Sequence, residues 1–165
     1  MKRGERKKRR ALSAFQHAVA RTPGIAEVFQ AGLGALIEAD RNRVSCQDTR
    51  ELTGSVHLDE ALAESVAHRD KPRWDYGIGH RERVFWVEVH PASSHHVDSI
   101  IKKYEWLRSW LGEEAPNLDA LPCDFVWLAA GAVSLPPGDR RRRLLAEKSI
   151  KFAGSHLRLD RPPEK

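Results

Sequence analysis

Two stretches near the middle of the chain alternate between apolar and polar side chains. Residues 74–78 (WDYGI) and 83–90 (RVFWVEVH) have the two-residue period of β-strands, and the link GHRE between them predicts an antiparallel hairpin. Residues 123–130 (CDFVWLAA) form a largely apolar run that predicts a further buried strand. The shorter candidate strands are residues 43–46, 53–58, 150–152 and 156–159.

Helical spacing or composition predicts helices around these strands. The clearest helix covers residues 94–111, where apolar side chains recur on one face and Gly112 follows as a stop signal. Asp59 is placed to cap a helix over residues 60–69. The other predicted helices cover residues 11–20, 24–43 and 139–147. This order of elements predicts an α/β fold with a mixed central sheet flanked by helices.

The chain of 165 residues is long enough for one domain with its own core. We assign residues 11–160 to that domain, residues 1–10 to a basic flexible arm and residues 161–165 to a frayed C-terminus. The sequence has no apolar run long enough to span a membrane, and the basic N-terminus is not followed by the apolar stretch of a secretory signal. These features predict a cytoplasmic protein. Cys46 and Cys123 are too few for a disulfide framework and are expected to be buried, reduced thiols.

The net charge of +5 is unevenly distributed along the chain. The first ten residues carry seven Lys or Arg and one Glu, whereas the rest carries 21 basic and 22 acidic residues, and a second basic cluster lies in the segment DRRRRLLAEK. Such clusters can neutralise phosphates, which predicts a nucleic-acid partner, although a solvated tail and a solvated helix face have the same composition. The candidate phosphate-binding residues are Lys7, Lys8, Arg9, Arg10, Arg140, Arg141, Arg142 and Arg143.

Asp75, Glu88 and His90 are polar residues within otherwise apolar strands. A hairpin that matches apolar faces pairs residues whose numbers add to 161 or to 163, and either register places these three on one face. The second register sets Asp75 directly opposite Glu88. Carboxylates this close repel each other, and either a shared divalent cation or a shared proton relieves the repulsion. If the remedy is a cation, Mg²⁺ or Mn²⁺ suits oxygen ligands. Gly77 is expected to leave room for a ligand beside Asp75.

The stretch WDYGIG…VFWVEVH and its flanking elements resemble the core of the PD-(D/E)xK nucleases, the restriction-endonuclease-like superfamily. The resemblance covers about residues 25–130 as an element order, α-β-β-β-α-β. It implies that Asp75 and Glu88, together with the carbonyl of Val89, hold Mg²⁺ or Mn²⁺. It also implies that the chain is a hydrolase that cleaves DNA, with RNA as the less favoured substrate.

Two positions depart from the family pattern. Pro72 lies three residues before Asp75 instead of directly before it, and His90 stands where the family has Lys. His90 could act as the general base, because an imidazole titrates near neutral pH. Alternatively, a lysine could reach in from the following helix, as it does in some family members. Of the two available, we favour Lys103 over Lys102, which is expected to point more toward solvent.

Other residues with potential chemistry have competing interpretations. His90, His95 and His96 could form a zinc site with a nearby carboxylate, although adjacent histidines in a helical turn cannot easily both reach one ion. Trp106 and Trp110 have i, i+4 spacing, which suits packing against each other or stacking on bases.

Three classes of function therefore remain open at the level of sequence. The first is a divalent-metal-dependent DNA nuclease, in which Glu38 could join the metal shell. The second is a catalytically inactive nuclease-like fold that serves as a nucleic-acid-binding or protein-interaction module. The third is a structural or interaction protein, such as a homodimer, in which the acidic pair is incidental.

Overall fold

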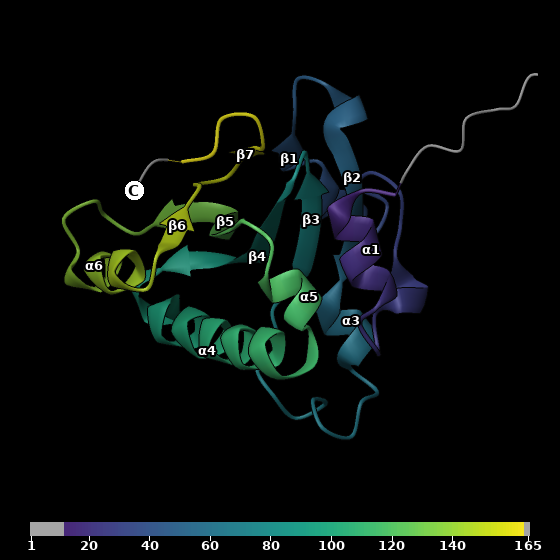
Figure 1. Cartoon of the computed structure of the whole chain (residues 1–165). Helices are drawn as coiled ribbons and strands as arrows, with labels where there is room; N and C mark the ends of the chain where they lie inside the picture. The colour runs from purple at the N-terminus through teal and green to yellow at the C-terminus, as the bar shows by residue number, and fades with distance from the viewer. Residues whose placement is uncertain (1–11, 164–165) are drawn as a thin grey trace, which may run out of the picture.

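A mixed sheet of five strands forms the centre of the computed structural model, which describes residues 12–163 (Figure 1). The strands lie in the order β2-β3-β4-β5-β6. Strands β2, β3 and β4 are antiparallel neighbours, whereas β4, β5 and β6 are parallel neighbours. The strand bounds are Leu52–His57 (β2), Tyr76–His80 (β3), Arg83–Ser93 (β4), Cys123–Ser134 (β5) and Ile150–Phe152 (β6). The predicted single-domain α/β fold with a mixed sheet is therefore confirmed.

The helices that bury side chains against this sheet pack on one of its faces. The longest helix, α4 (Val97–Glu114), connects β4 to β5, which run parallel and so need a crossover (Figure 1). Side chains from these helices bury Trp86 and Trp127 of the sheet in a common apolar core. The remaining helices are α1 (Ala14–Ala20), α2 (Glu38–Arg41), α3 (Leu58–Leu62), α5 (Pro116–Asp119) and α6 (Arg140–Glu147), with 3₁₀ turns η1 (Ala26–Val28), η2 (Thr49–Glu51) and η3 (Ser94–His96).

The opposite face of the sheet has its own core. A small parallel sheet of β1 (Val44–Ser45) and β7 (Leu157–Arg158) contributes Val44 and Leu157 to it. The members contributed by the main sheet are Tyr76, Ile78, Phe85, Val87, Val126 and Leu128. Both faces of the central strands are thus covered, which is why those strands contain so few polar residues.

In the hairpin of β3 and β4, the numbers of paired residues add to 163, which is the second of the two predicted registers. Tyr76 pairs with Val87, and Gly77 pairs with Trp86. Alternate residues of β4 enter opposite cores, as the two-residue period predicts. Trp74 departs from the alternation of the stretch WDYGI, which would place it on the face of Tyr76. It precedes β3 and packs in the helix-side core with Trp86, because the strand alternation does not extend back to it.

Strand β4 also runs further than expected. The alternating pattern predicts a strand that ends at His90, but the strand continues through Pro91 to Ser93. The pairing with β5 shifts between His90 and Ala92, so Pro91 lies at an irregularity in the ladder. A residue without an N–H is tolerated there, because a bulge leaves one position unpaired.

The predicted helix over residues 24–43 is wrong. This segment contains only η1 and α2, separated by turns. Gln30 instead forms an antiparallel bridge with Ser55, in which each backbone N–H donates to the other residue's carbonyl. Gly32 adopts a φ of +54°, a left-handed conformation that ends helical geometry and that glycine adopts without strain. The apolar spacing in this segment therefore reflects burial of a loop against the sheet.

Several remaining predictions concern ends and boundaries. The helix expected over residues 60–69 is shorter and earlier, since α3 ends at Leu62. The basic arm, residues 1–10, lies outside the described residues, as do residues 164–165 of the expected frayed end. Within the described part of the chain, no helix has both the length and the apolar character required to cross a bilayer.

Candidate functional site

Asp75 and Glu88 meet where β3 begins beside β4. The backbone N–H of Asp75 donates to Glu88 Oε2 at 2.9 Å, and the backbone N–H of Val89 donates to Asp75 Oδ2 at 3.0 Å. Each carboxylate thus accepts a hydrogen bond from the strand that carries the other. The structure therefore brings this predicted acidic pair together, and it places Val89 next to both residues.

A lysine from the helix that follows β4 completes this group. The Nζ atom of Lys103, on α4, donates to Glu88 Oε1. Lys102, one residue earlier, is exposed. The phase of α4 explains the difference, because Lys103 lies near the side on which Ile100 and Leu107 are buried. The lysine favoured from the sequence is the one that contacts the acidic pair.

His90 does not contact the acidic pair in this structure. Its Nδ1 atom lies 3.1 Å from the carbonyl oxygen of Pro91, and its ring lies 4.7 Å from the ring of His96. His96 in turn makes a 2.8 Å contact with Ser93 Oγ. Burial lowers the pKa of His90, which favours its neutral form.

The acidic pair lies in an environment that disfavours negative charge. Glu88 has 0% exposed surface, and this burial raises its pKa to about 8, with the charge of Asp75 adding to the effect and Lys103 opposing it. Burial likewise raises the pKa of Asp75 to about 6, against the hydrogen bond from Val89. For Lys103, burial acts to lower the pKa, but the attraction of Glu88 outweighs it and raises the pKa.

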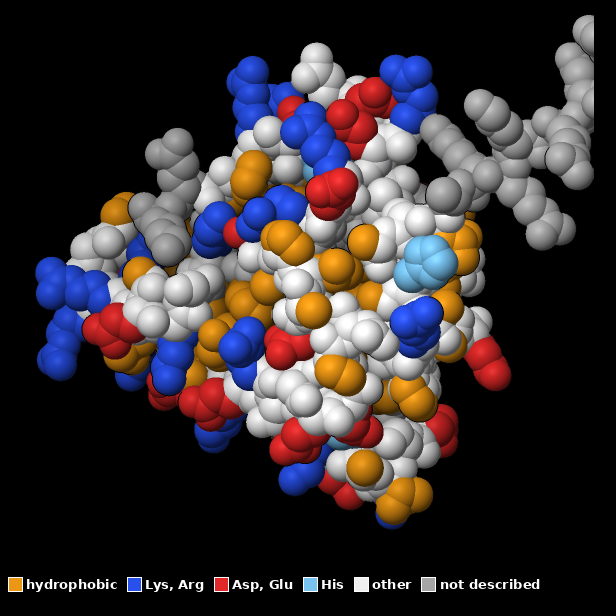
Figure 2. All heavy atoms as spheres, in the orientation of Figure 1, with side chains coloured by type: hydrophobic (Ala, Val, Ile, Leu, Met, Phe, Trp, Pro, Cys, Tyr) orange, Lys and Arg blue, Asp and Glu red, His pale blue; other side chains and the backbone are white. Residues whose placement is uncertain are grey.

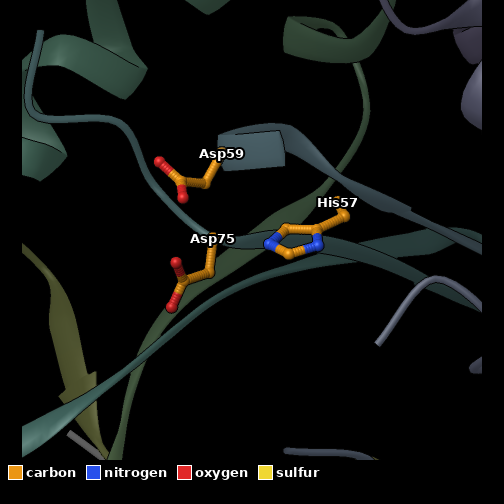
Figure 3. Close-up of side chains that lie close together, drawn as sticks. All are labelled: His57, Asp59 and Asp75. Atoms are coloured by element: carbon orange, nitrogen blue, oxygen red, sulfur yellow. The ribbon is translucent and has the colours of Figure 1, made fainter. Parts of the chain in front are cut away.

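A second cluster shares Asp75 (Figure 3). His57, the last residue of β2, and Asp59, in the first turn of α3, lie beside it. Each of the three side chains offers one ligand atom, and those atoms lie within 4.8 Å of one another. The figure shows an oxygen of Asp59 facing an oxygen of Asp75, with the His57 ring next to Asp75. This cluster contains one nitrogen donor and two oxygen donors.

Neither His57 nor Asp59 was identified as a ligand from the sequence. Asp59 was expected to cap a helix, but α3 begins before it. Its carboxylate instead forms an ion pair with Arg73, whose Nε lies 3.1 Å from Oδ1 and donates to the backbone carbonyl of Asp59. The signal that could have identified the pair is the spacing VHLD at the end of a predicted strand. Its use requires knowing that β2 ends beside the start of β3.

Other predicted residues have structural partners or lie elsewhere. Trp106 and Trp110 stack on each other with ring centroids 6.0 Å apart and are buried, so packing explains their spacing. Gly77 does not leave space for a ligand, because a Cβ atom there would lie 2.6 Å from the ring of Trp86. Among the described residues, His90, His95 and His96 do not form a three-ligand metal cluster.

The basic cluster predicted on the last helix is mostly exposed, although two of its arginines donate to backbone carbonyls. Arg141 donates to the carbonyl of Ser94 at 2.7 Å, and Arg142 donates to that of Leu135 at 3.1 Å. Arg140, Arg141 and Arg143 are exposed, and Arg142 is half-buried. Figure 2 shows basic side chains at the end of the molecule where α6 lies, with acidic ones among them. The other candidates, Lys7, Lys8, Arg9 and Arg10, lie outside the described residues.

Comparison of the chain with protein-family models, with curated proteins and with solved structures found no match. The function is therefore inferred from the geometry and chemistry of the residues themselves.

Proposed function

We propose that this chain is a divalent-metal-dependent phosphodiesterase that cleaves DNA. The observation that carries the proposal is the contact between Lys103 and Glu88 directly beside Asp75. Two acidic residues on neighbouring strands and a lysine from the next helix form the residue set that the resemblance to the PD-(D/E)xK nucleases implies. The lysine comes from α4 instead of from the strand position that His90 occupies.

The donor chemistry at Asp75 and Glu88 fits a hard divalent cation. Two buried carboxylates with raised pKa values are stabilised by positive charge, and Mg²⁺ and Mn²⁺ prefer oxygen ligands. Asp75 and Glu88 would hold the ion, with the carbonyl of Val89 as a third ligand. A bound ion of this kind supplies a water of lowered pKa and neutralises charge on a phosphate.

Lys103 is suited to assist hydrolysis at this site. Its ammonium group is fixed by Glu88, and its raised pKa keeps it charged at neutral pH. A fixed positive charge beside the reacting phosphate would stabilise the charge that develops on the phosphate oxygens. His90 is the alternative general base, and its neutral form would be the active one.

Charge distribution supports a nucleic-acid substrate. The net charge of +5 derives from the first ten residues, and the exposed Arg140 and Arg143 add a second basic group on α6. Side chains of this type neutralise phosphates of either strand without regard to sequence.

A catalytically inactive nuclease-like fold is the second candidate, serving as a nucleic-acid-binding or protein-interaction module. It is favoured by one specific observation: Glu88 is fully buried, and each of its oxygens already accepts a hydrogen bond. A buried carboxylate satisfied in this way can serve structure alone.

Cleavage assays with two neighbouring lysine variants test the proposal. Purified protein is incubated with single-stranded, duplex and branched DNA in Mg²⁺ or Mn²⁺, with EDTA as the metal-free control. We expect Lys103→Ala to lower the cleavage rate by about 10²–10⁴-fold, the usual effect of removing a group that assists proton transfer or stabilises charge. Lys102→Ala is the matched control, because this exposed neighbour should retain the wild-type rate.

The outcomes separate the candidate functions. Loss of activity in Lys103→Ala but not in His90→Ala assigns the assisting role to Lys103, and the reverse result assigns it to His90. If wild-type protein cleaves none of these substrates with either ion, the nuclease proposal is wrong. Salt-dependent DNA binding without cleavage would then support the inactive module.

A further inference from the structure

Three polar side chains converge where β2, α3 and β3 meet. His57 contributes an imidazole, and Asp59 and Asp75 contribute carboxylates, with their ligand atoms within 4.8 Å of one another (Figure 3). Nitrogen and oxygen ligands lie about 2.0–2.2 Å from a transition-metal ion, so even two ligands on opposite sides of an ion are about 4.4 Å apart. Small side-chain movements are therefore enough to bring all three atoms into contact with one ion.

The contacts around this cluster hold the ligands without occupying all of their donor atoms. Arg73 Nε binds Asp59 Oδ1 at 3.1 Å, and Arg73 is itself held by the carbonyls of His68 and Arg69. One oxygen of Asp59 is therefore fixed by a neutralising partner, and the second can face an ion. Asp75 similarly receives the Val89 N–H at Oδ2.

The His57 ring is held from two sides. It packs against the ring of Tyr76, with centroids 4.5 Å apart. Glu60 Oε2 lies 3.0 Å from Nδ1, although this buried nitrogen has no hydrogen bond of good angle. A carboxylate beside one ring nitrogen favours the proton there and leaves the lone pair of Nε2 for a metal, an arrangement typical of metal-binding histidines. Glu60 is therefore positioned to orient the ring through Nδ1, and Nε2 is the nitrogen that can bind an ion.

Glu88 is less suited than His57 to bind an ion. Its oxygens accept from Lys103 Nζ and from the Asp75 N–H, and it has 0% exposed surface. An ion placed on Glu88 would displace one of these donors and would lie close to the positive charge of Lys103. His57, by contrast, lines a surface pocket of about 480 Å³ together with Gln30 and Glu60, and all three side chains of the cluster are only partly buried.

We infer that His57, Asp59 and Asp75 form a divalent-cation site that takes Mn²⁺ or another first-row transition ion in preference to Mg²⁺. An imidazole ligand favours such ions, whereas Mg²⁺ favours oxygen ligands and retained water. The inference deepens the proposed function: it keeps Asp75 as a ligand of the ion and puts His57 and Asp59 in the place of Glu88 and the Val89 carbonyl. It rests on that proposal only for the use of the ion, because binding is measured without catalysis.

Metal binding to the intact chain tests the inference directly. Isothermal titration calorimetry with MnCl₂ and with MgCl₂ is performed on wild-type protein and on His57→Gln, Asp59→Asn, Glu88→Gln and Glu105→Gln. We expect tighter binding of Mn²⁺ than of Mg²⁺, and at least tenfold weaker Mn²⁺ binding in His57→Gln and in Asp59→Asn. Glu105→Gln, which changes an exposed glutamate on α4, is the control that should keep the wild-type affinity, and Glu88→Gln distinguishes this ligand set from the pair of Asp75 and Glu88. Circular dichroism and thermal unfolding show whether each variant is folded. If His57→Gln does not fold, Asp59→Asn alone tests the inference.

Each result has a defined meaning. If Glu88→Gln loses Mn²⁺ binding while His57→Gln and Asp59→Asn keep it, the ion lies between Asp75 and Glu88 and the inference is wrong. Absence of Mn²⁺ binding in wild-type protein also overturns it. Binding that depends on His57 without DNA cleavage supports this site and refutes the nuclease proposal, so the two failures are distinguishable.

Discussion

Replacing Glu88 by Gln tests whether this buried carboxyl is protonated in the folded, metal-free protein. Burial raises its pKa from 4.5 to about 8. The ionised form is therefore less stable in the folded protein than in the unfolded chain. For an acid with a raised folded pKa, the free energy of unfolding is highest below the unfolded value and falls as pH rises through the interval from 4.5 to about 8. Gln keeps the shape of the side chain and removes this proton equilibrium.

The size of the effect follows from the two pKa values. Each pKa unit corresponds to about 1.4 kcal/mol. Between pH 5 and pH 7.5, a glutamate in the unfolded chain is largely ionised, whereas folded Glu88 largely retains its proton. The wild-type free energy of unfolding should therefore fall by about 3 kcal/mol relative to that of Glu88→Gln across this interval. The amide still offers a carbonyl oxygen as an acceptor, so the variant is expected to fold.

Urea unfolding at pH 5 and pH 7.5, followed by tryptophan fluorescence, measures this difference. EDTA is included so that no ion replaces the proton. Glu105→Gln is the matched control, since it changes an exposed glutamate on α4 and should follow the wild-type pH dependence. If wild-type protein and Glu88→Gln change equally between the two pH values, Glu88 is ionised in the fold. Its attraction to Lys103 would then outweigh its burial, and the reasoning would be refuted.

Two further predictions concern the fold and the basic arm. Gly79→Ala should destabilise the protein by about 1–3 kcal/mol in urea, because a Cβ atom there would lie 2.1 Å from Thr53 Oγ1 and 2.6 Å from the ring of Phe15. Gly138→Ala has no neighbouring atom within 4 Å and should change stability little, so equal stability of the two variants would contradict the packing argument. Deleting residues 1–10 removes a net charge of +6 and should weaken DNA binding and flatten its dependence on salt. A salt slope identical to that of the full chain would show that the arm does not bind phosphates.

The hairpin at the centre of the fold could be predicted because the alternation of its side chains is visible in a short stretch of sequence and is repeated at several positions. Phe85 and Val87 alternate with Trp86 and Glu88, and a shift by one residue would move every apolar side chain to the wrong face. This constraint alone predicts that Asp75 and Glu88 share a face. It could not choose between the two permitted registers, because both satisfy the alternation.

The segment of residues 24–43 could not be predicted by the same means. Leu36 and Ile25 are buried, as a helical interpretation requires. However, they belong to a loop, in which Gln30 pairs with Ser55. Apolar spacing indicates which side chains are buried. It does not indicate whether the backbone N–H and C=O groups form hydrogen bonds within a helix or with a neighbouring strand. Gly32 and Gly34, inside this segment, were compatible with either outcome.

Asp75 contacts two groups of residues, and this determines which substitutions can distinguish between them. Its Oδ2 atom and its backbone N–H tie it to Val89 and to Glu88, respectively, whereas its side chain also lies against His57 and Asp59. Asp75→Asn should therefore impair both groups and cannot tell them apart. Glu88 and His57 each belong to only one group. A comparison of their variants in metal binding and in DNA cleavage is thus the experiment that separates the ion's ligands from the residues that position the lysine.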